Sequence, residues 1–204
     1  CRFDNMTARG GYARHTTLRN CASWSCSLRE VVIEECRVDG LRMRIENAGK
    51  TMPFFMWGCM ADRLTLAGRI GSLIWNPPDV PAPSDWNDRS RRFYAEVQWA
   101  VDITEAEFTT TPTFRCGPPG ELFRRDPVRQ PLVTRNAAVR ALESTGREAG
   151  VWAVILEDLL ASPWPNSTVL IPSDGAAKSV RDREQAGLDL LASVGAFDED
   201  PARR

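Results

Sequence analysis

Apolar side chains recur at a spacing of five residues along the first part of the chain. When residues 1–45 are written in blocks of five, the third residue of every block is apolar except Ser23. These third residues are Phe3, Ala8, Ala13, Leu18, Ser23, Leu28, Ile33, Val38 and Met43. The first residue of each block is small or apolar, and the other positions hold most of the charge. Neither a strand, with a period of about two, nor a helix, with a period of about 3.6, keeps this spacing.

A five-residue period with two inward side chains per block predicts a square coil. Each block forms one side, and four blocks form a turn of about 20 residues whose strands pair in parallel with those of the next turn, about 4.8 Å away. Residues twenty apart, such as Cys1 and Cys21, are therefore expected to stack on one another.

The five-residue register is interrupted twice before it is lost. It pauses over 46–53 and resumes over 54–68 as FFMWG, CMADR and LTLAG. It pauses again near 76–97, where four prolines and many charges predict a surface loop. It returns as VDITE and AEFTT at 101–110 and then fades. This pattern predicts one coil, residues 1–120, with two loop insertions.

The repeated block resembles the motif of the pentapeptide-repeat family, which is a small residue, Asp or Asn, Leu or Phe, and two polar residues. The blocks with Asp102 and Glu107 in second position match it best, whereas earlier blocks have Arg, Thr, Tyr, Val or Ser there. The resemblance implies a mainly β fold, a right-handed parallel β-helix with a square cross-section.

Helical patterning begins at about Glu121, where the register of five is lost. Thr134 is expected to cap a helix that stops at Gly146. An apolar stripe at helical spacing predicts a second helix, which ends before Pro163. The stripe consists of Trp152, Ile155, Leu156, Leu159 and Leu160.

The last part of the chain completes a small α/β unit, predicted to span 121–204. Residues 168–171 suit a short strand, and Ser173 is expected to cap a last helix over 174–194. An open coil end would expose unpaired backbone groups and core side chains. We therefore expect this unit to cap the last turn of the coil.

Composition and charge are those of an ordinary globular chain. The 204 residues include 26 Lys+Arg and 27 Asp+Glu, for a net charge of −1, and 43% are hydrophobic. This balance argues against disorder, against a strongly basic nucleic-acid binder and against a uniformly acidic surface. No apolar run is long enough to predict a membrane helix. Because the first residue is Cys1 rather than Met, we expect a fragment whose start is missing.

The cysteines and the histidine do not indicate a metal or catalytic site. The six cysteines contain no CxxC pair, and His15 is the only histidine, so we expect neither structural zinc nor a cofactor. Stacked Cys1 and Cys21 allow a disulfide or metal ladder, but small buried filler is the interpretation we favour. No phosphate-binding loop, HExxH, GxSxG or paired-carboxylate motif is present. The sequence therefore predicts no catalytic residue and no enzyme activity.

Arginines form the candidate interaction surface. Its residues are Arg9, Arg14, Arg29, Arg124 and Arg125. The first three lie at the fourth position of their blocks, which should face outward, and the last two lie in the run RRDP. An acidic partner or a phosphate would suit such arginines. The alternative is a solvated face, because Glu34 and Asp39 interrupt the basic columns, with RRDP as a simple junction.

These observations favour a non-enzymatic scaffold or protein-interaction module whose partner is another protein. One alternative, implied by the family resemblance, is a DNA-mimicking protein that interacts with DNA gyrase; the positive balance of residues 1–45 speaks against it. Another is an enzyme whose active site lies in the C-terminal unit or in a missing N-terminal domain. Buried thiols favour a cytoplasmic location. The partner and the oligomeric state stay open.

Overall fold

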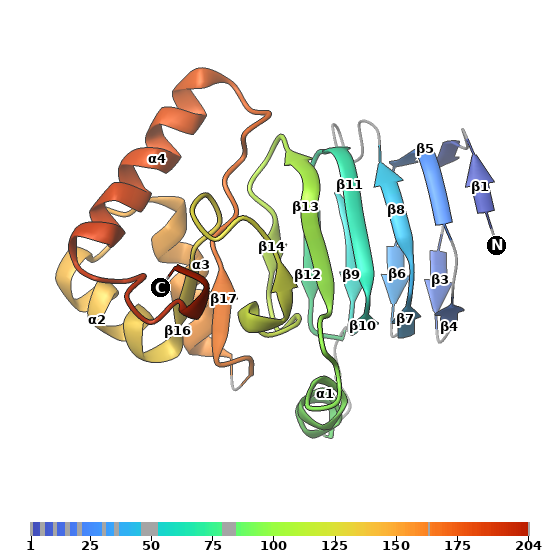
Figure 1. Cartoon of the computed structure of the whole chain (residues 1–204), viewed down its shortest axis with the longest axis horizontal. Coiled ribbons are helices and arrows are strands. Elements are labelled where there is room, and N and C mark those ends of the chain that lie inside the picture. Colours follow the sequence, from blue (N-terminus) through green and yellow to red (C-terminus); the bar gives the residue numbers. More distant parts are fainter. Residues whose placement is uncertain are drawn as a thin grey trace.

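The computed structural model describes most of the chain, and Figure 1 shows its arrangement. Residues 1, 5–6, 10–11, 15–16, 20–21, 30–31, 35–36, 46–52, 79–84, 163 and 204 lie outside the described residues. Side chains are described over 17–19, 37–43, 53–78, 85–162 and 164–202. Strands stand side by side from the N-terminal end to the middle of the molecule, and helices α2, α3 and α4 gather at the other end.

The strands of the N-terminal part are short and pair in parallel. They are β1 (Arg2–Asp4), β2 (Thr7–Arg9), β3 (Tyr12–Arg14), β4 (Thr17–Arg19), β5 (Ala22–Arg29), β6 (Val32–Glu34), β7 (Arg37–Asp39), β8 (Arg42–Ile45), β9 (Phe54–Trp57), β10 (Met60–Asp62), β11 (Leu64–Ile70), β12 (Leu73–Asn76), β13 (Val101–Phe108), β14 (Thr113–Phe114) and β15 (Phe123–Arg124). One sheet has the order β1-β5-β8-β11-β13-β15, with β2 also paired to β5. The others are β10-β7-β4 and β14-β12-β9-β6-β3.

The predicted spacing of twenty residues between paired strands is confirmed at the N-terminal end. Phe3 pairs with Ser23, and Leu18 pairs with Val38, which lies twenty residues further on. Across the interruption near 46–53 the spacing grows, because Val38 pairs with Ala61. The inserted residues are therefore accommodated without loss of the parallel pairing.

The two inward positions of each block are also confirmed where side chains are described. Most apolar first and third residues of the blocks are buried, and Ala106 is half-buried. Examples are Val38, Leu41, Met43, Phe54, Met56, Cys59, Ala61, Leu64, Leu66, Val101 and Ile103. Leu18 is half-buried and packs against the same core. The side chains of Leu28 and Ile33, and the predicted Cys1–Cys21 stack and His15, lie outside the described residues.

The predicted fold class is wrong, because the chain is an α/β mixture and not a mainly β protein. The described strands form four separate short sheets, one of them antiparallel, and four α-helices accompany them. Among the described residues these sheets do not join into one closed or continuous β-helix. The ladders are further broken where the register shifts between Thr65 and Ala67 and between Ser23 and Cys26. Register shifts and helix-forming segments thus interrupt the five-residue repeat.

The second interruption is not only a surface loop, since it contains helix α1 (Trp86–Tyr94). Trp86, Ser90 and Tyr94 are spaced four apart and are buried, so they form one helix face. The Tyr94 hydroxyl accepts a hydrogen bond from the backbone N of Ala61 at 3.3 Å, which ties α1 to β10. Burial raises the pKa of Tyr94, so this phenol stays neutral.

The C-terminal part contains the predicted helices and strand. The 3-10 helix η1 (Gly120–Leu122) precedes β15 and so belongs to the N-terminal part. The elements of the C-terminal part are β16 (Leu132–Thr134), α2 (Arg135–Thr145), α3 (Val151–Ala161), β17 (Ser167–Val169), α4 (Lys178–Ser193) and the 3-10 helix η2 (Pro201–Arg203). The Thr134 cap is confirmed, since its Oγ1 accepts a hydrogen bond from Ala137 N at 3.2 Å, and the helix stops at Gly146 with φ 53°.

The predicted Ser173 cap is wrong. Helix α4 begins at Lys178 with no side-chain cap, because the Ser173 hydroxyl donates to Glu184 instead.

The antiparallel pair β16–β17 lies between two cores. Val169 and Ile171 pack with the core of the parallel sheets, whereas Leu170 packs with the core formed by the C-terminal helices. Alternate residues of an extended segment point to opposite sides, so this segment packs against both halves of the molecule. Within the described part of the chain, no helix combines the length and the apolar composition needed to cross a membrane.

Candidate interaction surface

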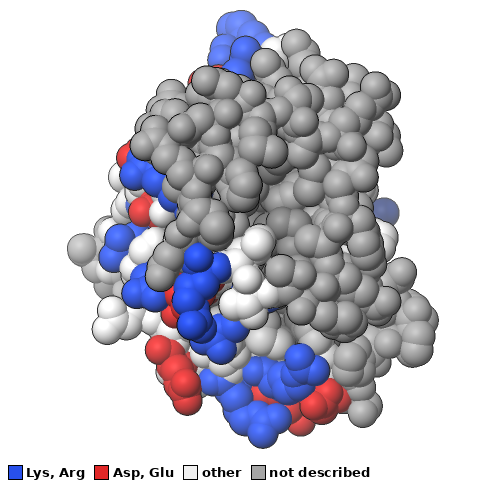
Figure 2. Space-filling model, turned by 90° about the vertical axis from the view of Figure 1, so that its right-hand side faces the viewer, with Lys and Arg blue, Asp and Glu red and all other residues white. Residues whose placement is uncertain are grey.

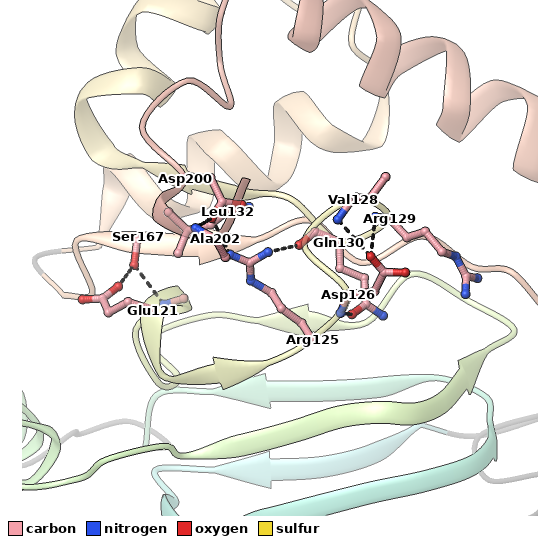
Figure 3. Close-up of polar contacts among 11 residues, drawn as sticks. Glu121, Arg125, Asp126, Val128, Arg129, Gln130, Leu132, Ser167, Asp200 and Ala202 are labelled. Atoms are coloured by element: carbon pink, nitrogen blue, oxygen red, sulfur yellow. Dashed lines mark hydrogen bonds and ion pairs between the residues drawn. The ribbon is translucent and has the colours of Figure 1, made fainter. Parts of the chain in front are cut away.

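The segment between β15 and β16, residues 125–131, is the junction loop that links the two halves (Figure 3). Asp126 Oδ1 accepts from the backbone N of Val128 at 2.9 Å and of Arg129 at 3.3 Å. Gln130 closes the loop, since its N donates to Asp126 O at 2.8 Å and its Oε1 accepts from Asp126 N at 3.1 Å. These bonds fix a tight turn, and Val128 at its tip is 72% exposed.

A buried ion pair anchors the C-terminal tail to the junction loop. Arg125 Nη2 lies 2.7 Å from Asp200 Oδ1, and the two side chains are 6% and 0% exposed. Asp200 also accepts from the backbone N of Leu132 at 3.0 Å and of Ala202 at 3.1 Å. Burial by itself would raise the pKa of Asp200, but these hydrogen bonds and the Arg125 charge hold it below its ordinary value. The tail is therefore a fixed part of the surface (Figure 3).

Polar contacts from other elements fix the two halves against each other. Ser167 Oγ of β17 donates to Glu121 and accepts from Gly120 N at 2.9 Å. Arg115 Nε lies 2.6 Å from Asp158 Oδ2 of α3. A Cβ on Gly120 would meet the backbone of Thr168 at 2.9 Å, so the close approach here requires glycine.

Glu184 of α4 is a buried carboxylate whose oxygens are all engaged. Oε1 accepts from Ser173 Oγ at 2.7 Å and from Thr111 Oγ1 at 2.5 Å, and Oε2 accepts from Ser173 N at 2.8 Å. Its backbone oxygen accepts from Trp152 Nε1 at 2.7 Å. Because neutral donors satisfy it, this carboxylate positions α4 against the parallel sheets.

A groove with a volume of about 450 Å³ lies between the junction loop and α4. Leu188, Phe197 and Pro131 line its base. Leu188 and Phe197 are each 7% exposed. Val128 stands at its edge. The charged lining residues are Asp174, Asp182, Glu184, Asp189, Arg129 and Arg181. The groove therefore combines an apolar base with a charged rim, on which Asp174 pairs with Arg129 and Asp182 pairs with Lys178.

Cys116 is a free thiol, and the Cys59 thiol donates to the backbone oxygen of Trp57 at 3.6 Å. Burial raises the pKa of Cys116, while a hydrogen bond with Ser162, at 2.8 Å between Sγ and Oγ, acts in the opposite direction. A raised thiol pKa disfavours the nucleophilic thiolate. Where the structure describes side chains, no three His, Cys, Asp or Glu residues converge as metal ligands would.

The structure places the five predicted arginines in different surroundings. Arg9 and Arg29 are paired in the β2–β5 ladder, as their spacing predicted, whereas Arg14 lies in the sheet that contains β3; their side chains lie outside the described residues. Arg124 is exposed and lies over Trp99, with its Cζ 4.2 Å from a ring centroid. Arg125 is held inside by Asp200. That the five form an interaction surface stays a prediction.

Sequence reasoning missed the groove and its lining. Val128 alone left a local signal, because an apolar residue directly after Asp-Pro is placed at a turn. Leu188 and Phe197 read as ordinary core residues of a helical unit, and their position across from the junction loop follows only from tertiary packing.

Comparison with protein-family models, curated proteins and solved structures finds no match to this chain. The resemblance to the pentapeptide-repeat family therefore stays a prediction. The function has to be argued from the geometry of the surface.

Proposed function

We propose that this chain is a non-enzymatic protein-interaction module that binds a segment of a partner protein in the groove between the junction loop and α4. One observation carries the proposal: Val128, at 72% exposure, stands beside a groove with an apolar base. Val128 together with the apolar base of the groove forms one continuous apolar surface, and such surfaces occur at binding sites.

The groove is pre-organised, which favours binding. The junction loop is closed by hydrogen bonds from Asp126 and Gln130, and the Arg125–Asp200 pair holds the tail in place. A rigid surface loses little conformational entropy when a partner binds. The polar groups of the junction loop and of the tail are already bonded to one another, so they hold the groove in its shape.

The charges of the rim indicate the chemistry of the partner. Arg129 is paired with Asp174, and Lys178 is paired with Asp182. Asp189 instead accepts a hydrogen bond from the neutral amide of Gln185 at 2.8 Å. A segment with an apolar anchor and flanking Lys or Arg residues would complement this rim. The anchor would occupy the desolvated centre, where binding energy concentrates.

A pair of matched variants tests the proposal. Ala192 lines the groove and is exposed, whereas Ala186 is exposed on the same helix but does not line it. Random peptides displayed on phage are selected on the wild-type protein, and the enriched peptides are then titrated against each variant. We expect enriched peptides to combine an apolar residue with Lys or Arg, and Ala192→Arg to weaken binding at least tenfold while Ala186→Arg does not. If no peptide is enriched, or both variants bind equally well, the proposal is wrong.

We also propose a cytoplasmic location and kinship with pentapeptide-repeat proteins. Cys116 is a free thiol, which supports a cytoplasmic setting, where thiols stay reduced. The blocks VDITE and AEFTT at 101–110 support kinship with pentapeptide-repeat proteins.

A further inference from the structure

Two exposed arginines on the parallel sheets lie over aromatic rings. Arg124 of β15 has its Cζ 4.2 Å from a ring centroid of Trp99, and Arg37 of β7 has its Cζ 5.1 Å from the ring centroid of Phe93. Both rings are half-buried, and Phe93 packs against the main core. The fold thus fixes both rings, which in turn restrict the guanidinium groups above them.

The two stacks are close in the fold. Arg37 pairs with Met60 in the β7–β10 ladder. Three residues further along, Arg63 N donates to Trp99 O at 3.2 Å. Three residues of chain span at most about 10 Å, so an extended peptide of about six residues reaches from one stack to the other.

Within the described part of the chain, neither stacked arginine forms a hydrogen bond or close ion pair with a carboxylate, although the charge of Arg37 acts on Asp39. Asp39 is occupied by Arg63, at 2.7 Å, and by Arg19, at 3.2 Å, and the Arg63 hydrogen bond holds the pKa of Asp39 below its ordinary value. Asp102, which pairs with Arg124 in the β13–β15 ladder, accepts from Thr104 N and Oγ1. Asp39 and Asp102 are therefore already engaged.

A guanidinium that lies over a ring uses its face for that contact, and its N–H edge stays available for a carboxylate or phosphate. We propose that Arg37 and Arg124 form a two-point clamp for an acidic segment of a partner protein. Each arginine binds one carboxylate of the segment through its N–H edge. This surface is separate from the groove, so it adds a second binding site and does not depend on the first.

A protein segment fits this surface better than a nucleic acid. Figure 2 shows blue and red atoms intermixed at the bottom of the end-on view, at the height where Figure 1 places α1. Acidic residues of this region, such as Asp62, Asp88 and Glu96, would repel a continuous phosphate backbone. A peptide places its carboxylates only where the two arginines are.

The experiment measures fluorescence anisotropy, on the full chain, of a fluorescein-labelled peptide in which four Ser residues separate two Glu residues. Controls are the same peptide with Lys in place of Glu, and a labelled single-stranded oligodeoxythymidine. We expect the Glu peptide to bind, the Lys peptide not to bind, and added NaCl to weaken the complex. Arg37→Gln and Arg124→Gln should each weaken binding about tenfold. Arg124→Lys should also weaken it, because an ammonium group cannot bind a carboxylate bidentately.

Matched variants separate this clamp from other effects. Arg183→Gln removes an exposed arginine from α4 and should leave peptide binding unchanged, as should Ala192→Arg in the groove. Thermal unfolding of each variant checks that it is folded. Absence of binding by the Glu peptide, equal binding by the Arg37→Gln/Arg124→Gln double variant, or tighter binding of the oligonucleotide would each overturn the proposal.

Discussion

Single residues fix the junction through contacts that lie far apart in the sequence, and the Arg125–Asp200 pair is the clearest case. Asp200→Asn removes one partner and leaves a buried guanidinium without its counter-charge. We expect a loss of about 3–5 kcal/mol in the free energy of unfolding at pH 7, measured with urea. Because the pKa of Asp200 is lowered in the folded state, the carboxylate stabilises the fold above its ordinary pKa of 3.8 and ceases to do so as the pH falls through the lower folded value. The difference between variant and wild type should therefore shrink in strong acid. Glu143→Gln, an exposed change on α2, is the control and should alter stability little; an equal loss for both variants would contradict the assignment.

At the scale of elements, the five-residue register predicts which strand residues point inward. Ile103 is 0% exposed, while its neighbour Thr104 is exposed. Ile103→Asp places an unpaired charge in the core and should lower the free energy of unfolding by more than about 4 kcal/mol. Thr110→Asp, at an exposed position of the next block, should change it by less than about 1 kcal/mol. Circular dichroism during thermal unfolding measures both, and similar melting temperatures would show that the register is misassigned. This register and the Thr134 cap could be predicted because they depend on neighbouring residues. Helix α1 was missed because prolines hid the spacing of Trp86, Ser90 and Tyr94, and the Ser173 cap failed because Ser173 bonds a carboxylate on another element. The groove could not be predicted, since its walls meet only in the folded chain.

At the scale of the whole molecule, one extended segment decides whether the two halves unfold together. Ile171 belongs to the core of the parallel sheets although it follows β17 of the C-terminal part. Ile171→Ala should cost about 2–5 kcal/mol, since it leaves a cavity in that core. Hydrogen exchange followed by mass spectrometry should then show faster exchange both in β13 and in α3, because the polar contacts between Arg115 and Asp158 and between Thr111 and Glu184 couple the halves. Val154→Ala, which truncates an exposed side chain of α3, should leave both elements protected. If Ile171→Ala increased exchange in only one of these two elements, the halves would unfold as independent units.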